Sequence, residues 1–466
     1  MNKIFLAFFI PLFVCCNSHE SNNTYFGGEI VNPTDDYVVL YKNDQFIDSI
    51  KLDKNNRFLV KLKNPKSGLY NFKHNPEYQY FFINEGDSIL LRLNTLDFDE
   101  SLVFSGRGAD KSNMLMDILL MQEDEANLIK SYYTLSEEKF SVKIDSLKAI
   151  KMAELDDFTN THTVSDDTNM YLEAAINYPY YRYLEIYPYY HRRFQDGFQV
   201  VDVPKAYYNY QNEISYDGKE LSYFRPYFDY MVVHFNNLSY LDCYNNCKLE
   251  NRNVPNRRTL HRTEHKLKII DSLVTEQTLR DHLYRNTAYD YLLHDEDKEN
   301  NLKFFNIYKQ YSKKNQYNEE VYELYENVQK LQPGNELPAL QLVNTSGEMV
   351  KINTIKGKSK TIFYFWSEKQ TNHLKLLTKQ ITDLKQKYPA YQFIGINVNA
   401  DQKNWKNAVQ QYQMNTSNQF RADNFNALSK ALILKDLNKA IIIDSNGHII
   451  DAFTQIDANN IEQYLK

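Results

Sequence analysis

The sequence predicts a multidomain α+β protein with an N-terminal antiparallel β-sandwich, a tyrosine-rich α-helical middle and a C-terminal α/β domain. Three observations support this fold class. A chain of 466 residues is too long for one ordinary hydrophobic core. Its pattern changes from short strands in residues 24–107 to helical periodicity in residues 110–331. Strands and helices then alternate through residues 333–466, which predicts an α/β domain.

The first region consists of short apolar segments separated by turn residues. The turn clusters are "NPTDD", "DKNN", "NPKSG" and "NEGD". Many short strands at regular spacing favour an antiparallel sandwich or barrel. The expected strands are "YVVLYKN", "FIDSIKLD", "RFLVKLK", "YNFKH", "YQYFFI", "SILLRLN" and "SLVFSG".

The middle region is rich in tyrosine, and the whole chain carries 38 Tyr and 27 Phe. Its densest piece is "NYPYYRYLEIYPYYHRRF", Asn177 to Phe194. Pro179 and Pro188 are expected to restrict helix to what lies between or beyond them. Tyrosine rings can pack helices together, which we expect here, or they can line a groove for a small ligand or glycan.

The C-terminal region begins after a break at Pro333-Gly334. A short strand and a hairpin-like "NTSGE" come first, then the strand "TIFYFW" and the helix "HLKLLTKQITDLKQKY". The strand "YQFIGINVNA", the helix "NWKNAVQQYQ", the hairpin "KAIIIDSNGHIIDAF" and the helix "DANNIEQYLK" complete the order.

This order, with "PGNELPALQLVNTSGEMVKI" at its start and "IIIDSNGHII" near its end, resembles the TlpA-type branch of the thioredoxin and alkyl-hydroperoxide-reductase superfamily. The strand region, through "GLYNFKHNPEYQYFFINEGDSILLRLN", resembles the β-domain that precedes thioredoxin-like domains in Bacteroidetes-type lipoproteins. The resemblance implies a thioredoxin fold and, in intact members, thiol-disulfide exchange by two cysteines two residues apart.

The residues that would carry that exchange are absent. If Phe365-Trp366 is the family's Phe-Trp, the two cysteines are replaced by Gln370 and His373, and the family's cis-proline is replaced by Asn438. An amide and an imidazole cannot supply the attacking and resolving thiols. We therefore expect a thioredoxin fold without redox chemistry, and no catalytic residues.

The N-terminus reads as an export signal. "MNKIFLAFFIPLFVCC" has an apolar run from Ile4 to Val14, too short to span a bilayer stably. The cysteine pair that closes it resembles a bacterial lipobox, with Cys16 (or Cys15) as the lipidated residue after a signal peptide of residues 1–16. We expect a lipid-anchored cell-envelope protein on the periplasmic or surface face of the outer membrane. An ordinary signal peptide or a plain membrane anchor is the alternative.

Two further motifs lie in the helical middle. Cys243 and Cys247, spaced i, i+4, could form a disulfide in an oxidising compartment or could be half-buried small residues. "HRTEH", from His261 through Glu264 to His265, matches the H-x-x-E-H of inverted zinc peptidases. Its surroundings read as an ordinary amphipathic helix, so we expect no metal site and no cofactor.

These observations predict a binding or scaffold protein that engages a protein partner in the envelope. The formal charge of −6 excludes a general attraction to nucleic acid. One alternative is a thiol-disulfide oxidoreductase of TlpA type that uses Cys243 and Cys247. A second is a small-ligand or glycan receptor built on the tyrosine clusters.

Overall fold

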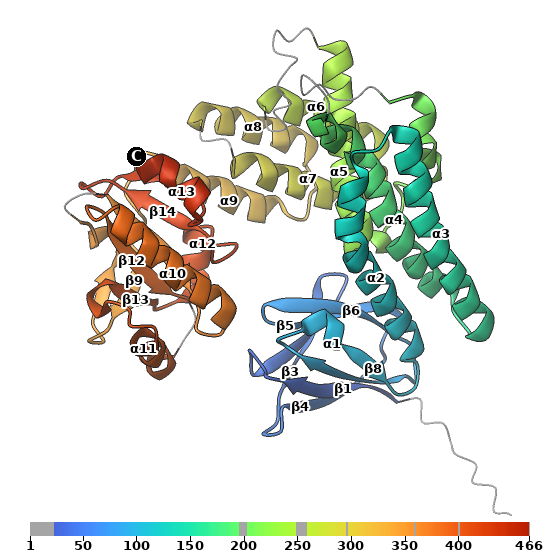
Figure 1. The fold of residues 1–466 in the computed structure, drawn as a ribbon, viewed down its shortest axis with the longest axis horizontal. Helices are drawn as coiled ribbons and strands as arrows, with labels where there is room; N and C mark the ends of the chain where they lie inside the picture. The colour runs from blue at the N-terminus through green and yellow to red at the C-terminus, as the bar shows by residue number, and fades with distance from the viewer. Residues whose placement is uncertain are drawn as a thin grey trace, which may run out of the picture. The chain divides into compact units, whose positions relative to one another are not determined.

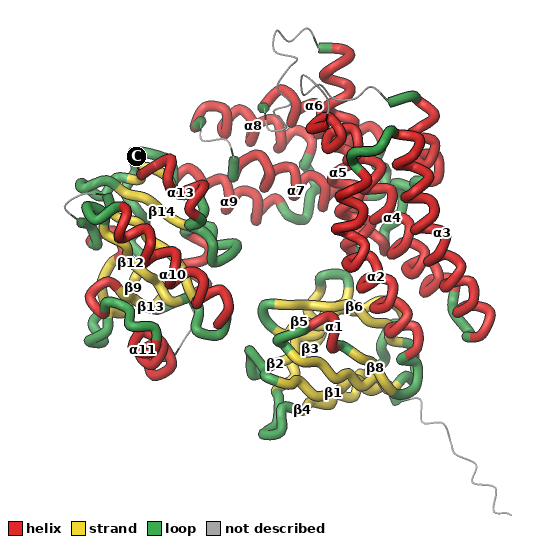
Figure 2. The backbone as a smooth tube through the Cα atoms, in the orientation of Figure 1, coloured by secondary structure: helices red, strands yellow, loops and turns green. Residues whose placement is uncertain are grey.

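The computed structural model describes residues 23–194, 203–247, 259–294, 297–357, 360–398 and 401–465 (Figures 1 and 2). The expected signal peptide and lipidated Cys16 (or Cys15) lie outside these residues. The chain divides into two compact units, residues 1–133 with 142–180, and residues 134–141 with 181–466. In the described part, no helix combines the length and apolar character needed to cross a bilayer.

The N-terminal domain is a β-sandwich of two four-stranded sheets, ordered β4-β1-β7-β8 and β3-β2-β5-β6. Every expected strand segment is present, and most pairs are antiparallel. The pairing of β1 with β7 is the one parallel ladder among the described strands of this domain. The strands are β1 (Thr24–Val31), β2 (Tyr37–Lys42), β3 (Gln45–Lys51), β4 (Arg57–Leu62), β5 (Gly68–His74), β6 (Glu77–Ile83), β7 (Ser88–Asn94) and β8 (Val103–Ser105), with the short helix α1 (Phe98–Ser101) before β8.

The two sheets share one aromatic core. Phe26 of β1 stacks on Phe81 of β6 with ring centroids 4.4 Å apart, and both rings are fully buried. Phe72 and Phe104 pack against Phe81 from β5 and β8. Rings from both sheets therefore close the sandwich, and burial of such large apolar surfaces is its main source of stability.

Helices dominate the chain from residue 110 to residue 330, as the periodicity predicts. Figure 2 shows most of the described part of this region as helix. The elements are α2 (Asp110–Tyr132), α3 (Glu137–Thr161), α4 (Asp166–His191), η1 (Arg192–Phe194), η2 (Lys205–Glu213), η3 (Glu220–Tyr223), α5 (Arg225–Asn246), α6 (Leu260–Leu273), α7 (Gln277–Leu292), α8 (Lys298–Tyr311) and α9 (Asn318–Lys330).

The expected breaks at Pro179 and Pro188 do not occur, because α4 continues through both prolines. A proline inside a helix leaves the carbonyl four residues earlier without its N–H donor. Here side chains replace both donors: the amide of Gln122 donates to the carbonyl of Ala175 at 2.6 Å, and the Tyr207 hydroxyl donates to the carbonyl of Leu184 at 3.0 Å. Long-range hydrogen bonds thus replace those that the prolines remove, and the helix continues despite the helix-breaking tendency of proline.

The tyrosines of α4 are mostly buried. Tyr180 and Tyr187 are fully buried, and Tyr178, Tyr181 and Tyr189 are each less than a tenth exposed. Rings enclosed between helices cannot stack on a glycan from solvent. The packing role expected for these rings is therefore confirmed, and these buried rings give no support to a glycan groove at this cluster.

The C-terminal domain is a seven-stranded sheet in the order β10-β9-β13-β12-β11-β14-β15. Figure 1 shows α10 and α13 on one face of it, where their apolar residues share a core with Trp366 and Trp405. The elements are β9 (Gln341–Asn344), β10 (Met349–Lys351), η4 (Ile352–Thr354), β11 (Thr361–Trp366), α10 (Thr371–Lys387), β12 (Gln392–Asn397), α11 (Gln402–Gln411), η5 (Thr416–Asn418), β13 (Gln419–Ala422), α12 (Phe425–Ala431), β14 (Ala440–Ile443), β15 (Ile449–Asp451) and α13 (Ala458–Leu465).

Sequence reasoning missed β13 and α12. β13 is only four residues long and lies between β12 and β9, so it completes the sheet. Gln419 at its start accepts a hydrogen bond from the Trp366 indole at 3.0 Å and donates to the Tyr364 hydroxyl at 2.9 Å. Gly395 leaves room for this buried network, because an added Cβ would lie 2.3 Å from the Gln419 side-chain oxygen.

Candidate functional site

The turn between β11 and α10 holds the positions where the resemblance places a redox pair. Gln370 is the N-cap of α10, and His373 lies in the first turn of that helix. The structure brings Asn438, which precedes β14, to the same place: His373 Nε2 lies 3.1 Å from Asn438 Oδ1. The three positions inferred from the resemblance therefore lie around one turn.

This turn cannot perform thiol chemistry, because no cysteine occurs in residues 333–466. A hydrogen bond between an imidazole and an amide joins this turn to the loop that precedes β14. The turn is partly open to solvent, and Leu376, one turn further along α10, is 70% exposed. The arrangement offers polar and apolar groups for contact but no thiol that could attack a disulfide or resolve the mixed species.

A second constellation lies where α5 ends and α6 begins. Cys243 occupies the last turn of α5, and Cys247 is its C-cap residue, whose N–H donates to the carbonyl of Cys243 at 3.0 Å. Thr259 caps the start of α6, its hydroxyl accepting from a backbone N–H of the first turn. The capped helix places His261 and His265, four residues apart, on the same face.

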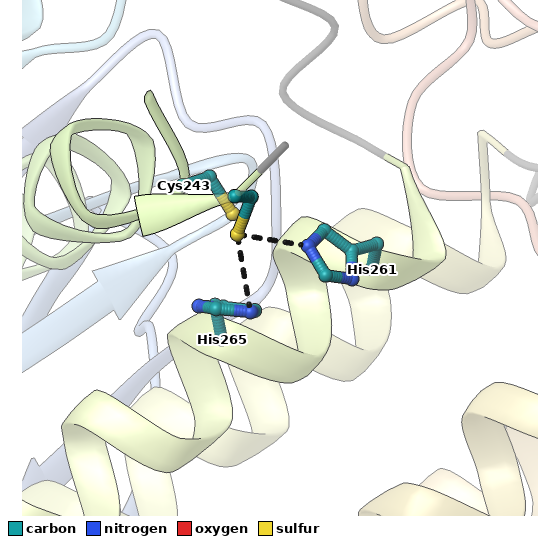
Figure 3. Close-up of side chains that lie close together, drawn as sticks. Cys243, His261 and His265 are labelled. Atoms are coloured by element: carbon teal, nitrogen blue, oxygen red, sulfur yellow. Dashed lines mark hydrogen bonds between the residues drawn. The ribbon is translucent and has the colours of Figure 1, made fainter. Parts of the chain in front are cut away.

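Four side chains converge at this point. One ligand atom from each of Cys243, Cys247, His261 and His265 lies within 4.8 Å of all the others. Figure 3 shows Cys243, His261 and His265 turned toward one another. His261 Nε2 is 3.1 Å from the Cys247 sulfur, and His265 Nε2 is 3.7 Å from the same atom. Two sulfurs and two imidazole nitrogens form the ligand set typical of a structural zinc site.

Asp242 contacts His265 at the ring nitrogen that does not face the cysteines. Its carboxylate Oδ2 lies 2.6 Å from His265 Nδ1, while Asn246 donates to the other carboxylate oxygen at 2.8 Å. The hydrogen bond to His265 is the main reason that the pKa of Asp242 lies below its ordinary value. With Nδ1 engaged by the carboxylate, Nε2 is the nitrogen that points at the sulfur.

Cys243 does not have the properties of a reactive thiol. Burial, with the neighbouring Cys247, raises the pKa of Cys243 to about 12, whereas redox-active cysteines have depressed values. Both cysteines are free in the structure. In the structure the two sulfurs are not bonded to each other, and the Cys247 sulfur lies beside the histidines of α6.

Taken separately, neither motif predicts a metal site. "HRTEH" alone matches a peptidase motif within an ordinary amphipathic helix, and the cysteines alone suggest a disulfide or two half-buried small residues. Glu264 lies outside the cluster, so the peptidase interpretation finds no support in the structure. The signal that could have joined the motifs is their order, C-x₃-C followed by H-x₃-H, which falls within zinc-finger spacing.

Comparison with known proteins identifies the kind of domain at the C-terminus. Residues 357–449 match the thioredoxin-like family, so this domain is thioredoxin-like, as the resemblance predicted. No curated protein matches the chain.

Several solved structures are similar to parts of the chain. A thioredoxin-like protein from Bacteroides caccae is 14% identical over 57% of this chain and 95% of its own, with a TM-score of 0.36. The thioredoxin domain of a thiol-disulfide oxidoreductase from Bacteroides vulgatus is 20% identical over 29% of this chain and 99% of its own, with a TM-score of 0.24. A thiol:disulfide interchange protein from a Bacteroides species is 20% identical over 26% and 81%, with a TM-score of 0.22. Similarity at this level transfers no activity.

Proposed function

We propose that this chain, whose C-terminal domain is thioredoxin-like, works by binding a protein partner and does not exchange disulfides. The observation that carries the proposal is the β11–α10 turn, where Gln370 and His373 replace the redox pair and His373 bonds Asn438. A fold alone does not specify an activity, so the function is argued from this site. The chain would act as a tethered envelope scaffold, held by an N-terminal lipid.

The same turn is a suitable contact surface. Gln370 and His373 present polar groups at the start of α10, and Leu376 presents an exposed aliphatic side chain on the same helix. In intact family members the corresponding loops hold an extended peptide against the redox pair. Loss of the thiols with retention of the loops favours a surface that binds without reacting.

The first test measures redox activity directly. The full chain should reduce insulin disulfides in the presence of dithiothreitol no faster than dithiothreitol alone. The double variant Gln370→Cys/His373→Cys is the positive control for geometry, because a thiol at the α10 N-cap is acidified by the helix N-terminus. Wild-type activity comparable to that of an intact relative would overturn the proposal. If Cys243→Ser/Cys247→Ser abolished that activity, it would support the oxidoreductase alternative.

The second test looks for the partner. A photo-crosslinking amino acid at position 370 or 376 should capture one recurrent envelope protein in intact cells. The same group at Met349, an exposed residue of β10 four strands away from β11 in the sheet, serves as the matched control. Equal capture from all three positions, or no recurrent protein, would contradict a partner-binding role for the turn.

A further inference from the structure

We infer that Cys243, Cys247, His261 and His265 form a zinc site that joins the end of α5 to the start of α6. This inference is independent of the function proposed for the thioredoxin-like domain, because all four residues belong to the helical region. It rests on the convergence of four ligand atoms, on the metal preference of two sulfurs with two imidazoles, and on the contact between Asp242 and His265.

The distances suit a tetrahedral ion. Four ligands at about 2.0–2.3 Å from one zinc ion lie roughly 3.3–3.8 Å from one another. The separations of His261 Nε2 and His265 Nε2 from the Cys247 sulfur, 3.1 and 3.7 Å, are already close to that range. The widest separation in the set is at most 4.8 Å, so small side-chain rotations would complete the coordination sphere.

The types of ligand indicate which metal ion this site would bind. Two thiolates and two neutral imidazoles balance the charge of a divalent cation, and soft sulfur with imidazole favours zinc over magnesium or calcium. All four positions are taken by protein atoms, which describes a closed structural site and not a catalytic site with an open position for water.

Asp242 supplies a feature that zinc-bound histidines commonly have. Zinc-ligating histidines commonly donate their second ring N–H to a carboxylate, which fixes the ring orientation and the tautomer. The 2.6 Å contact between Asp242 and His265 Nδ1 has this form and leaves Nε2 for the metal. His294 also pairs with an aspartate, Asp290 at 3.8 Å, yet it does not belong to the four-residue cluster, so it provides a matched control.

The site would change the interpretation of the two cysteines. A zinc-bound thiolate is neither a free nucleophile nor half of a disulfide. Because α5 and α6 are separated in sequence by residues 247–259, coordination would crosslink the two helices and hold their ends together. Metal binding would then contribute to the stability of the helical region.

The test uses the full chain, purified without reductant or chelator. Zinc content by mass spectrometry should be about one ion per chain, and cobalt substitution should give the sulfur-to-cobalt charge-transfer band of a tetrahedral thiolate site. Cys247→Ser and His265→Gln should each weaken zinc binding at least tenfold in a competition assay with a chromogenic chelator. Asp242→Asn should weaken it about 10–100-fold, while His294→Gln should leave it unchanged.

Wild-type protein alone can overturn the inference, which keeps it testable if a variant fails to fold. Chelation should lower the melting temperature of the wild type, and zinc should protect Cys243 and Cys247 from alkylation, as mapped by peptide mass spectrometry. Folded, reduced wild type that takes up no zinc at micromolar concentration would contradict the inference. A Cys243–Cys247 disulfide in metal-free protein taken directly from cells would also contradict it.

Discussion

Glu185 of α4 and His234 of α5 form a buried pair: a carboxylate oxygen of Glu185 lies 2.7 Å from His234 Nδ1, and both side chains are at most 2% exposed. Asn237 donates to the second carboxylate oxygen at 2.7 Å, and Gln211 donates to the first at 2.7 Å. Every oxygen of the buried carboxylate therefore has a donor. A buried charge is tolerated only with such complete pairing.

The Glu185 network should make the helical region sensitive to acid. Burial opposes ionisation, but His234 and the two amides outweigh it, so the pKa of Glu185 lies below its ordinary value. A carboxyl group with a lowered folded pKa stabilises the fold above its unfolded pKa of about 4.3, and this contribution is lost as the pH falls through the folded value. Glu185→Gln should lose up to about 3–5 kcal/mol of stability at pH 7.

Thermal unfolding from pH 7 down to pH 3 checks this expectation. The exposed Glu138 of α3 offers the control Glu138→Gln, which should behave like wild type. An unchanged melting temperature for Glu185→Gln at pH 7 would show that the network does not stabilise the fold.

The hydrogen bond from Gln122 should matter only because Pro179 is present. Gln122→Leu leaves the buried carbonyl of Ala175 without a donor, which should cost about 1–3 kcal/mol. In a Pro179→Ala background the alanine N–H can donate to that carbonyl, so the same Gln122→Leu change should cost less. A double-mutant cycle by urea denaturation measures the difference. Equal costs in both backgrounds would mean that the proline does not create the need for Gln122.

Lys439, next to Asn438, should make the C-terminal domain more stable at high pH. Burial lowers the pKa of Lys439 from 10.5 to about 7, although Asp451 and Asp436 oppose the shift. Between pH 7 and about 10.5 the unfolded chain binds a proton that the folded chain does not, so stability rises with pH across this window. Below pH 7 the ammonium must be buried in the folded state.

Lys439→Met should therefore be more stable than wild type at pH 6, by on the order of a few kcal/mol, with the difference shrinking towards pH 10. The loss of the 3.3 Å hydrogen bond from Lys439 Nζ to the Ile433 carbonyl reduces the gain. Melting curves of wild type and Lys439→Met from pH 6 to pH 9 test this prediction, with the exposed Lys375→Met as the control. A pH-independent difference between wild type and Lys439→Met would refute the titration argument.

Local patterns in the sequence were enough to predict most of the fold. The alternation in "YVVLYKN" and "SILLRLN" became β2 and β7, and the apolar run "TIFYFW" became β11 with all six residues buried. β13 was not predicted, because four residues are too few to show a strand periodicity. Its place in the sheet depends on the neighbouring strands β12 and β9.

The sites were predicted less completely, because they depend on contacts between distant residues. Gln370, His373 and Asn438 were found through the resemblance, which supplies their spacing. The Cys/His cluster needed α5 and α6 to be adjacent, and the pair of Glu185 and His234 needed α4 and α5 to be packed together. Neither adjacency is encoded in the periodicity of a single helix.

The two prolines of α4 have a consequence for how that helix finds its place. Each proline exposes one carbonyl at a defined point, and each carbonyl is matched by one donor, Gln122 for Ala175 and Tyr207 for Leu184. If α4 slid along its neighbours by a turn, the tyrosine surface could still be covered, but both carbonyls would lose their donors. Proline usually breaks helices, but these two prolines specify the register of α4, because only the native packing gives both carbonyls a donor. A single buried polar residue specifies the register of a coiled coil in the same way.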